Sequence, residues 1–269
     1  MINSCSATIP KPIALAGIGP TAENALQRLQ TAHPSNVQFL HSDGSLGPGL
    51  LHEAGLLILV TELASVADCR AVQNLIKQMQ PSGFATTTLC VAMKPSADAD
   101  KEQKVQAQHS LQLLEMHADA TVVLSGDDEE DLGTWLTDRI SGLAQAVAND
   151  GSVGIDIDEL SSLLRNSDSA VWVNAQSEGM SRVEAAAAAI RSQYARHAGR
   201  GHVYHHAMVW VQGARQSLNL SETRSLMKTL SQHLLTDSPQ LICGISYDES
   251  LGGRMRVSAL LCRPQPKTN

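Results

Sequence analysis

The chain has 269 residues, of which 43% are hydrophobic and 17% charged, so it is long enough to bury one large core or two ordinary ones. A net charge of −7 and an aromatic content of 3% argue against nucleic-acid binding, because no basic stripe offsets the charge and few rings could stack on bases. No apolar run reaches the roughly 18–20 residues of a membrane span, and the first residues lack the layout of a secretory signal, so we expect a cytoplasmic protein.

Short apolar strands alternate with amphipathic helices through the first half of the chain. Strands are predicted over residues 12–19, 37–42, 55–63, 86–95 and 120–126. Helices are predicted between them, over residues 21–32, 66–80 and 98–118. Strands that alternate with helices form a mostly parallel sheet covered on both faces, so the first half has the layout of a nucleotide-binding α/β domain.

A long amphipathic helix separates this half from the rest. Its apolar stripe consists of Leu132, Trp135, Leu136, Ile140, Leu143 and Val147. Beyond it the order of elements changes, and the last two strands, 240–247 and 254–263, are joined by the turn "DESLGG", which predicts a hairpin. We therefore predict an N-terminal α/β domain over 1–128, a central helix over 129–150 and a C-terminal α+β domain with a mixed sheet over 151–269.

The stretch "GIDIDEL" (154–160) places Asp156, Asp158 and Glu159 within four residues at the start of a predicted helix. A metal site, a pair of catalytic acids and a solvated helix start all share this pattern. Acidic side chains stabilise a helix N-terminus by roughly 0.3–1 kcal/mol each, and two carboxylates without substrate phosphates hold magnesium poorly. The helix start is therefore the simplest interpretation of the residues alone.

Two other groups of potential ligands favour structural roles. His205 and His206 fall on a predicted strand, where alternation sends them to opposite faces, so with His202 they are interpreted as surface or rim histidines and not as a metal site. The five cysteines have no CxxC spacing, and three of them lie in apolar strand-like runs. This arrangement favours buried free thiols over disulfides or zinc ligands.

Three segments of the sequence follow the residue pattern of one known family. The segment "CGISYDESLGGRMRVSALLC" (243–262) is similar to the end of the C-terminal domain of FtsZ, the bacterial tubulin-like division GTPase. Residues 91–128 resemble its V-V-T-K-P-F segment with the helix and strand that follow, and residues 155–190 resemble the stretch after its central helix. The resemblance runs in unbroken order over about 12–263, and it implies the tubulin/FtsZ-like fold.

The resemblance offers a role for "GIDIDEL". In FtsZ the loop at the foot of the central helix carries N-x-D-x-x-D, which enters the nucleotide pocket of the next subunit and positions the attacking water. Gly154, Asp156 and Glu159 stand at the three motif positions, with Asp158 between the two carboxylates. In-line attack on a γ-phosphate needs a positioned acceptor for the water, which suits these side chains. The resemblance thus implies that this loop is an interaction site that acts on a neighbour.

The loop that would bind phosphate departs from the family. In FtsZ the strand that corresponds to "GLLILV" runs into G-G-G-T-G-T-G, whose backbone N–H groups approach the phosphates. The aligned run here is "ELASVADCR" (62–70), which has no glycine, and Glu62 and Asp68 add negative charge beside it.

The first loop is also thinned. The family's G-x-G-G-G-G-G-N becomes "GIGPTAEN", which keeps Gly17, Gly19 and Asn24 as remnants but gains Pro20, which has no N–H. Micromolar binding corresponds to about −8 kcal/mol, and the loss of three backbone hydrogen bonds to phosphate removes about 5–9 kcal/mol. We therefore expect weak or absent GTP binding, no other cofactor and no enzymatic activity.

These departures favour a function in protein association. The partner would be a second copy of the chain, a true FtsZ, or both, in a homo- or hetero-oligomer that regulates division or assembles without nucleotide. The alternatives are an active tubulin-like GTPase with a remodelled pocket and a structural filament unrelated to division. The chain ends at "RPQPKTN", a few residues after the last strand, so no direct membrane tether is expected.

Overall fold

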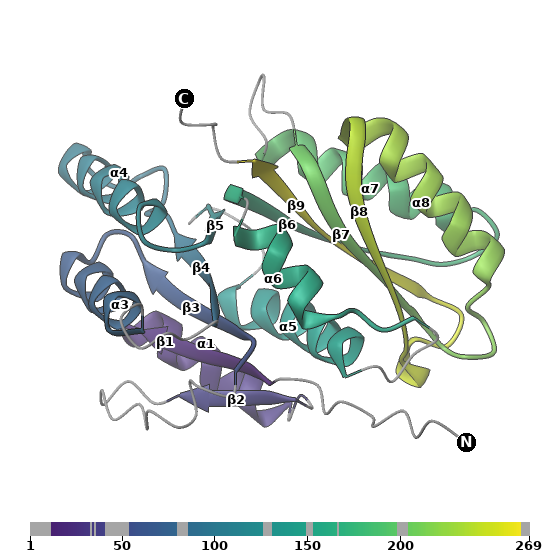
Figure 1. The fold of residues 1–269 in the computed structure, drawn as a ribbon, viewed down its shortest axis with the longest axis horizontal. Coiled ribbons are helices and arrows are strands. Elements are labelled where there is room, and N and C mark those ends of the chain that lie inside the picture. Colours follow the sequence, from purple (N-terminus) through teal and green to yellow (C-terminus); the bar gives the residue numbers. More distant parts are fainter. Residues whose placement is uncertain are drawn as a thin grey trace, which may run out of the picture.

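The protein folds around one nine-stranded sheet with the strand order β2-β1-β3-β4-β5-β6-β9-β7-β8 (Figure 1). The structure is a computed structural model of the chain. It describes residues 12–32, 34, 36–40, 54–79, 86–125, 131–148, 153–165, 167–197 and 204–264.

The N-terminal half is a parallel sheet of five strands. These are β1 (Ile13–Ile18), β2 (Val37–Leu40), β3 (Leu56–Glu62), β4 (Thr87–Met93) and β5 (Ala120–Leu124). Each strand reads as an apolar run because both faces are covered. On β3, Leu56, Ile58 and Val60 enter the core beneath α1 (Pro20–Thr31), whereas the alternate residues enter the core beneath α3 (Val66–Met79) and α4 (Lys101–Glu115).

Helix α5 (Leu132–Val147) is the predicted central helix. It begins at Asp131, whose carboxylate accepts the backbone N–H of Gly133 at 2.9 Å, and this cap explains the start of the helix. The predicted span of 129–150 extends beyond the helix at both ends, partly into residues outside the described part of the chain. Among the described helices, none combines the length and the apolar composition needed to cross a bilayer. The predicted location in the cytoplasm stays a prediction.

The C-terminal half contains the remaining four strands and three helices. In chain order the elements are α6 (Ile157–Arg165), β6 (Ser167–Ser177), α7 (Arg182–His197), β7 (Tyr204–Gly213), α8 (Leu220–Leu234), β8 (Leu235–Tyr247), the short 3-10 helix η2 (Glu249–Leu251) and β9 (Met255–Pro264). Helices α7 and α8 cover one face of these strands, at the opposite end of the sheet from α3 and α4 (Figure 1). With the parallel strands of the first half, this confirms the predicted α/β class with a mixed C-terminal sheet.

The predicted hairpin of the last two strands is wrong. β8 pairs in parallel with β7, whereas β9 lies between β6 and β7 and is antiparallel to both. Residues Val257–Cys262 of β9 are fully buried, so this strand needs neighbours on both edges. β8 keeps a half-buried stretch at Leu241–Cys243 and takes the edge of the sheet. The connection over 248–254, which contains η2, is long enough to pass β7.

The two halves meet in a continuous sheet and a shared aromatic cluster. One residue pair, Val122 with Ala170, joins β5 to β6 in parallel. The three tryptophans of the chain, Trp135 on α5, Trp172 on β6 and Trp210 on β7, stack edge to face with both centroid distances at 5.6 Å. This cluster packs α5 against the C-terminal strands. The predicted domain boundaries at 128 and 150 lie outside the described residues and stay predictions.

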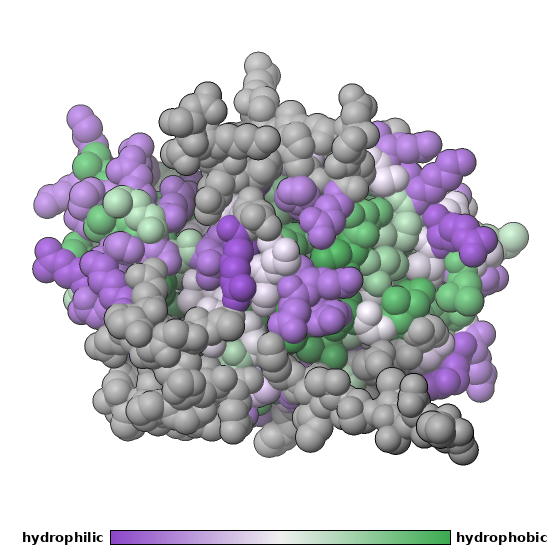
Figure 2. Space-filling model, viewed as in Figure 1, coloured by the Kyte–Doolittle hydropathy of each residue, from purple (hydrophilic) through white to green (hydrophobic). Residues whose placement is uncertain are grey.

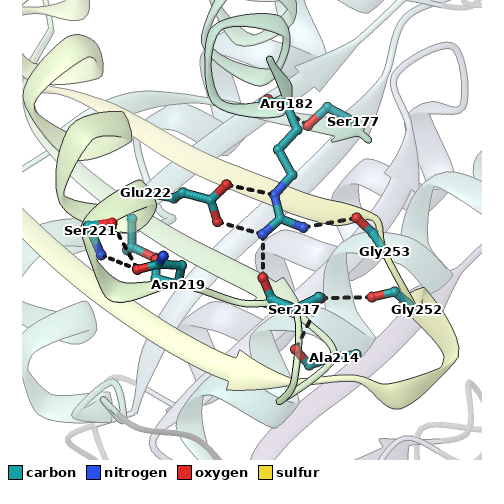
Figure 3. A network of polar contacts seen from close by, with 10 residues as sticks. Ser177, Arg182, Ala214, Ser217, Asn219, Ser221, Glu222, Gly252 and Gly253 are labelled. Carbon is teal, nitrogen blue, oxygen red and sulfur yellow. Dashed lines mark hydrogen bonds and ion pairs between the residues drawn. The ribbon is translucent and has the colours of Figure 1, made fainter. Parts of the chain in front are cut away.

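A buried arginine, Arg182, connects α7, α8 and two loops of the C-terminal half (Figure 3). Arg182, at the start of α7, donates to both carboxylate oxygens of Glu222 on α8, at 3.1 and 2.5 Å. Its remaining donors go to the carbonyl oxygens of Ser217 and Gly253. One side chain therefore ties α7, α8 and the β8–β9 connection together.

Candidate functional site

The strand order locates a ligand crevice in the N-terminal half. From β1 the chain continues to β2 on one side, and then returns to β3 on the other side. In open parallel sheets, ligands bind beyond the carboxyl ends of the strands at such a switch point. The candidate ligand position, called the crevice below, therefore lies between Gly19, after β1, and Leu63, after β3. The hollow that described residues line near this turn is formed by β1, α1 and β2, with Gly17, Gln27 and Phe39 in its wall.

The β1 side of the crevice is a tight turn that needs its two glycines. A Cβ on Gly17 would lie 2.9 Å from the backbone of Ala22, and Gly19 has a φ of 98°, which side chains rarely adopt. Gly19 precedes α1 without a capping side chain, and Pro20 opens the helix without an N–H. Of the predicted remnants, Gly17 is buried, Gly19 is half-buried and Asn24 is exposed on α1.

The β3 side brings a carboxylate into this turn. The N–H of Leu63 is bonded to the carbonyl of Met93, and the backbone N–H of Asp68 donates to Ser65 Oγ at 3.2 Å. The Asp68 side chain then reaches across the crevice to Gly19. A Cβ built on Gly19 would lie 2.4 Å from Asp68 Oδ2 and 3.0 Å from its Cγ. The negative end of Asp68 thus lies beside the N-terminus of α1, where an anion is stabilised.

Two cations stand at the same end of the sheet. Lys94 directly follows β4, and Arg70 lies in the first turns of α3, two residues after Asp68. Both side chains are exposed, and neither forms an ion pair with another described residue. Sequence reasoning missed these cations as site residues, although the position of Lys94 after a buried strand was a usable signal.

The "GIDIDEL" segment leads into α6. Asp156 accepts the backbone N–H of Asp158 on its Oδ1 at 2.8 Å, and its own carbonyl accepts the N–H of Leu160 at 3.0 Å. Asp156 is therefore the N-cap of α6, as the helix-start interpretation predicts. Asp156, Asp158 and Glu159 are exposed, and Gly154 is half-buried. In the part of the chain that the structure describes, no three His, Cys, Asp or Glu side chains are grouped to hold a metal ion.

Backbone contacts hold this segment against two other elements. The N–H of Ile155 donates to the carbonyl of Ala146 on α5, and Val153 forms an antiparallel bridge with Ile245 on β8. The Ile155 side chain fills the space above Gly244, where a Cβ would lie 2.6 Å from it. In Figure 2, hydrophobic side chains gather over β7 and β8, whereas the end with α3 and α4 is mainly hydrophilic. The segment is thus attached to the more apolar part of this face.

The two groups of predicted site residues lie at opposite ends of the N-terminal sheet. Ser161 Oγ on α6 donates to the carbonyl of Gly55, which precedes β3, so α6 lies at the amino end of that strand. The crevice with Gly17 and Gly19 lies at the carboxyl ends. The chain therefore does not bring the two groups together, and a composite site would need two subunits.

Comparison with known proteins rests on structure. No protein-family model matches the sequence, and no curated protein matches it either. A mutant FtsZ of M. jannaschii matches with a TM-score of 0.80 at 17% identity, over 95% of this chain and 92% of that one. The chain has the tubulin/FtsZ fold.

Other proteins with the tubulin/FtsZ fold match over similar lengths. A GTPγS-bound protofilament of a Haloferax volcanii CetZ has a TM-score of 0.69 at 16% identity, covering 96% of this chain and 94% of that one. TubZ of Clostridium botulinum phage c-st has a TM-score of 0.63 at 15% identity, covering 95% and 94%. An FtsZ of M. jannaschii is a dimer in another of these structures. Dimers and protofilaments therefore occur among proteins of this fold.

The comparisons correct one expectation. The sequence predicted a protein without enzymatic activity, because the glycine-rich phosphate loop is missing. The folds that match, those of FtsZ, CetZ and TubZ, are folds of GTPases, and this contradicts the prediction. The missing glycines therefore do not by themselves establish that the chain lacks enzymatic activity.

Proposed function

We propose that this protein is an assembly subunit of the tubulin/FtsZ type that associates head-to-tail with copies of itself. The observation that carries the proposal is the placement of two complementary ends on one sheet. The crevice lies at the carboxyl ends of β1 and β3, and the 153–159 segment lies beyond the amino end of β3. A contact between unlike ends leaves one of each end free, so it can repeat.

Charge supports the pairing of these ends. The 153–159 segment presents the exposed carboxylates of Asp158 and Glu159, and the crevice end presents the exposed cations of Arg70 and Lys94 around the half-buried carboxylates of Glu62 and Asp68. Opposite charges across an interface guide association and fix its register. Val153, which is 43% exposed, adds an apolar contact beside the carboxylates.

Sedimentation velocity tests the proposal. Wild-type protein should show concentration-dependent species larger than a monomer, and these should shrink as salt is added, because exposed ion pairs are screened. The variant Asp158→Asn/Glu159→Gln should self-associate about ten-fold more weakly, since exposed charge pairs contribute roughly 0.2–1 kcal/mol each. Glu184→Gln, an exposed acidic residue on α7, is the matched control and should behave as wild type. A monomer at every concentration would rule the proposal out.

A second candidate function is the capping of an FtsZ filament. Asp68 places a carboxylate where a nucleotide-loaded neighbour would carry phosphate, so only the 153–159 end of this chain matches such a neighbour. A subunit with one matching end would dock onto a terminal FtsZ and stop growth. Light scattering of FtsZ with GTP tests this: substoichiometric protein should shorten the polymers, and the Asp158→Asn/Glu159→Gln variant should not. Equal polymer mass and length with and without the protein would exclude capping.

A further inference from the structure

We propose that Asp68 is a built-in anion that fills the phosphate end of the crevice, so that a nucleotide must displace its carboxylate to bind. This inference concerns the crevice of the proposed assembly subunit. The contact of Asp68 with Gly19 is independent of assembly, and only its role in a filament rests on the proposed function. It assigns to one residue of α3 the control of ligand entry between β1 and β3.

The first argument is steric. Asp68 Oδ2 lies 2.4 Å, and Cγ 3.0 Å, from the point where a Cβ of Gly19 would stand. Gly19 has no side chain, so the carboxylate occupies the space that the glycine leaves open above the start of α1. A phosphate oxygen that approached Gly19 as closely would coincide with the carboxylate. The two groups therefore exclude each other.

The second argument is that the backbone of α3 holds Asp68 in place. The next residue, Cys69, is 2% exposed and its thiol donates to the carbonyl of Glu62 at 3.4 Å. Val72, one turn further, is fully buried in the core beneath α3 and α4. Because these contacts fix the helix, the carboxylate can leave Gly19 by rotation of its own side chain and not by movement of the helix. Displacement is thus a local event that needs no unfolding.

The third argument is electrostatic. The N-terminus of α1 favours a negative group, and Asp68 already supplies one. A bound phosphate would compete for that position and would also be repelled by the Asp68 carboxylate at close range. Removal of the Asp68 charge should therefore strengthen phosphate binding, and removal of both charge and volume should strengthen it further.

Isothermal titration with GTPγS and with GDP tests the inference on the full chain. Asp68→Asn keeps the size and removes the charge, whereas Asp68→Ala removes both. Relative to wild type, we expect Asp68→Ala to bind at least about ten-fold more tightly, which corresponds to about 1.4 kcal/mol, with Asp68→Asn between the two. Asp98→Asn changes an exposed aspartate that follows β4 and does not contact Gly19, and it should match wild type.

The outcomes are distinct from those of the self-association test. Equal affinities for wild type and both Asp68 variants, including a common absence of binding up to about 1 mM, would overturn the inference. Thermal unfolding curves that coincide in the absence of nucleotide establish that the variants are folded. Sedimentation of the same samples without nucleotide reports on the head-to-tail contact alone, so each proposal can fail while the other stands.

Discussion

Asp156 stabilises the start of α6, and any test of its role in protein association must distinguish this effect on stability from an effect on binding. Its carboxylate caps α6 through the N–H of Asp158. Asp156→Ala should lower the free energy of unfolding by about 0.5–2 kcal/mol, whereas Asp156→Ser, which can still cap, should leave it nearly unchanged. Urea unfolding measures both. Equal losses of stability in the two variants would show that the carboxylate charge, and not the cap, stabilises the protein.

Burial should make the cysteine thiols of the sheet unreactive. Burial raises the pKa of both Cys90 and Cys262 to about 12, from an ordinary value of 9.0, so these thiols stay protonated at pH 8. The protonated form is favoured in the folded state, and its contribution to stability is complete below pH 9 and declines as the pH rises from 9 toward 12. Alkylation at pH 8 with site-resolved mass spectrometry should modify both only after denaturant is added. Rapid modification of Cys90 in buffer would contradict this burial.

At the scale of single residues, part of the candidate site could be predicted from the sequence. Gly17, Gly19 and the carboxylates after Gly154 were identifiable because the turn and the helix start depend on nearby residues only. The sequence also indicated that Asp68 adds negative charge to the crevice. Its direct contact with Gly19 depends on how α3 is rotated over the sheet, which buried residues such as Cys69 decide, and no local pattern reveals that.

The packing of α5 is tested by two glycines within the same helix. A Cβ on Gly142 would lie 2.8 Å from both Gln212 Oε1 and Trp210 Nε1, which are buried in the C-terminal sheet. Gly142→Ala should therefore cost about 1–3 kcal/mol of stability through overpacking. A Cβ on Gly133 meets only side-chain atoms of the exposed Arg28–Asp131 pair, Arg28 Cδ at 3.1 Å and Asp131 Oδ1 at 3.2 Å, which can shift by a few tenths of an ångström. Gly133→Ala should therefore be neutral or stabilising by up to about 1 kcal/mol. Urea unfolding of both variants decides, and similar effects would contradict the packing described here.

The hydrogen bonds of Arg182 should be the main polar interaction that holds α7 and α8 together. Arg182→Ala leaves Glu222 and the carbonyls of Ser217 and Gly253 without this partner, and we expect it to destabilise the protein by about 2–4 kcal/mol. Arg191→Ala, on the exposed side of the same helix, is the control and should change stability by less than about 0.5 kcal/mol. Denaturation midpoints that shift equally in the two variants would show that the network contributes little.

At the scale of elements, alternation of strands and helices was sufficient to predict the parallel sheet of the first half, because each strand is mainly apolar and each helix has one apolar face. The order of the last strands could not be predicted in the same way. Sequence proximity favoured a hairpin of β8 and β9, but β9 pairs along both of its edges, with β6 and with β7. The pattern of side chains in a strand reports the burial of its two faces and not which strands pair along its edges.

At the scale of the whole molecule, the proposed function depends on two ends that no single subunit brings together. The resemblance to FtsZ pointed to the loop at one end and to the thinned first loop at the other, and the structure places them at opposite ends of the N-terminal sheet. The central claim is that these unlike ends bind each other between copies of the chain.

Sedimentation velocity of two end variants, alone and mixed, tests this claim most directly. Asp158→Asn/Glu159→Gln neutralises one end, and Arg70→Gln/Lys94→Gln neutralises the other. At a concentration just sufficient for wild type to assemble, each variant alone should be mainly monomeric, because its self-association is about ten-fold weaker. An equimolar mixture should form dimers and nothing larger, since each pair offers one intact junction. A mixture that stays monomeric, or variants that assemble alone as wild type does, would contradict head-to-tail association through these ends.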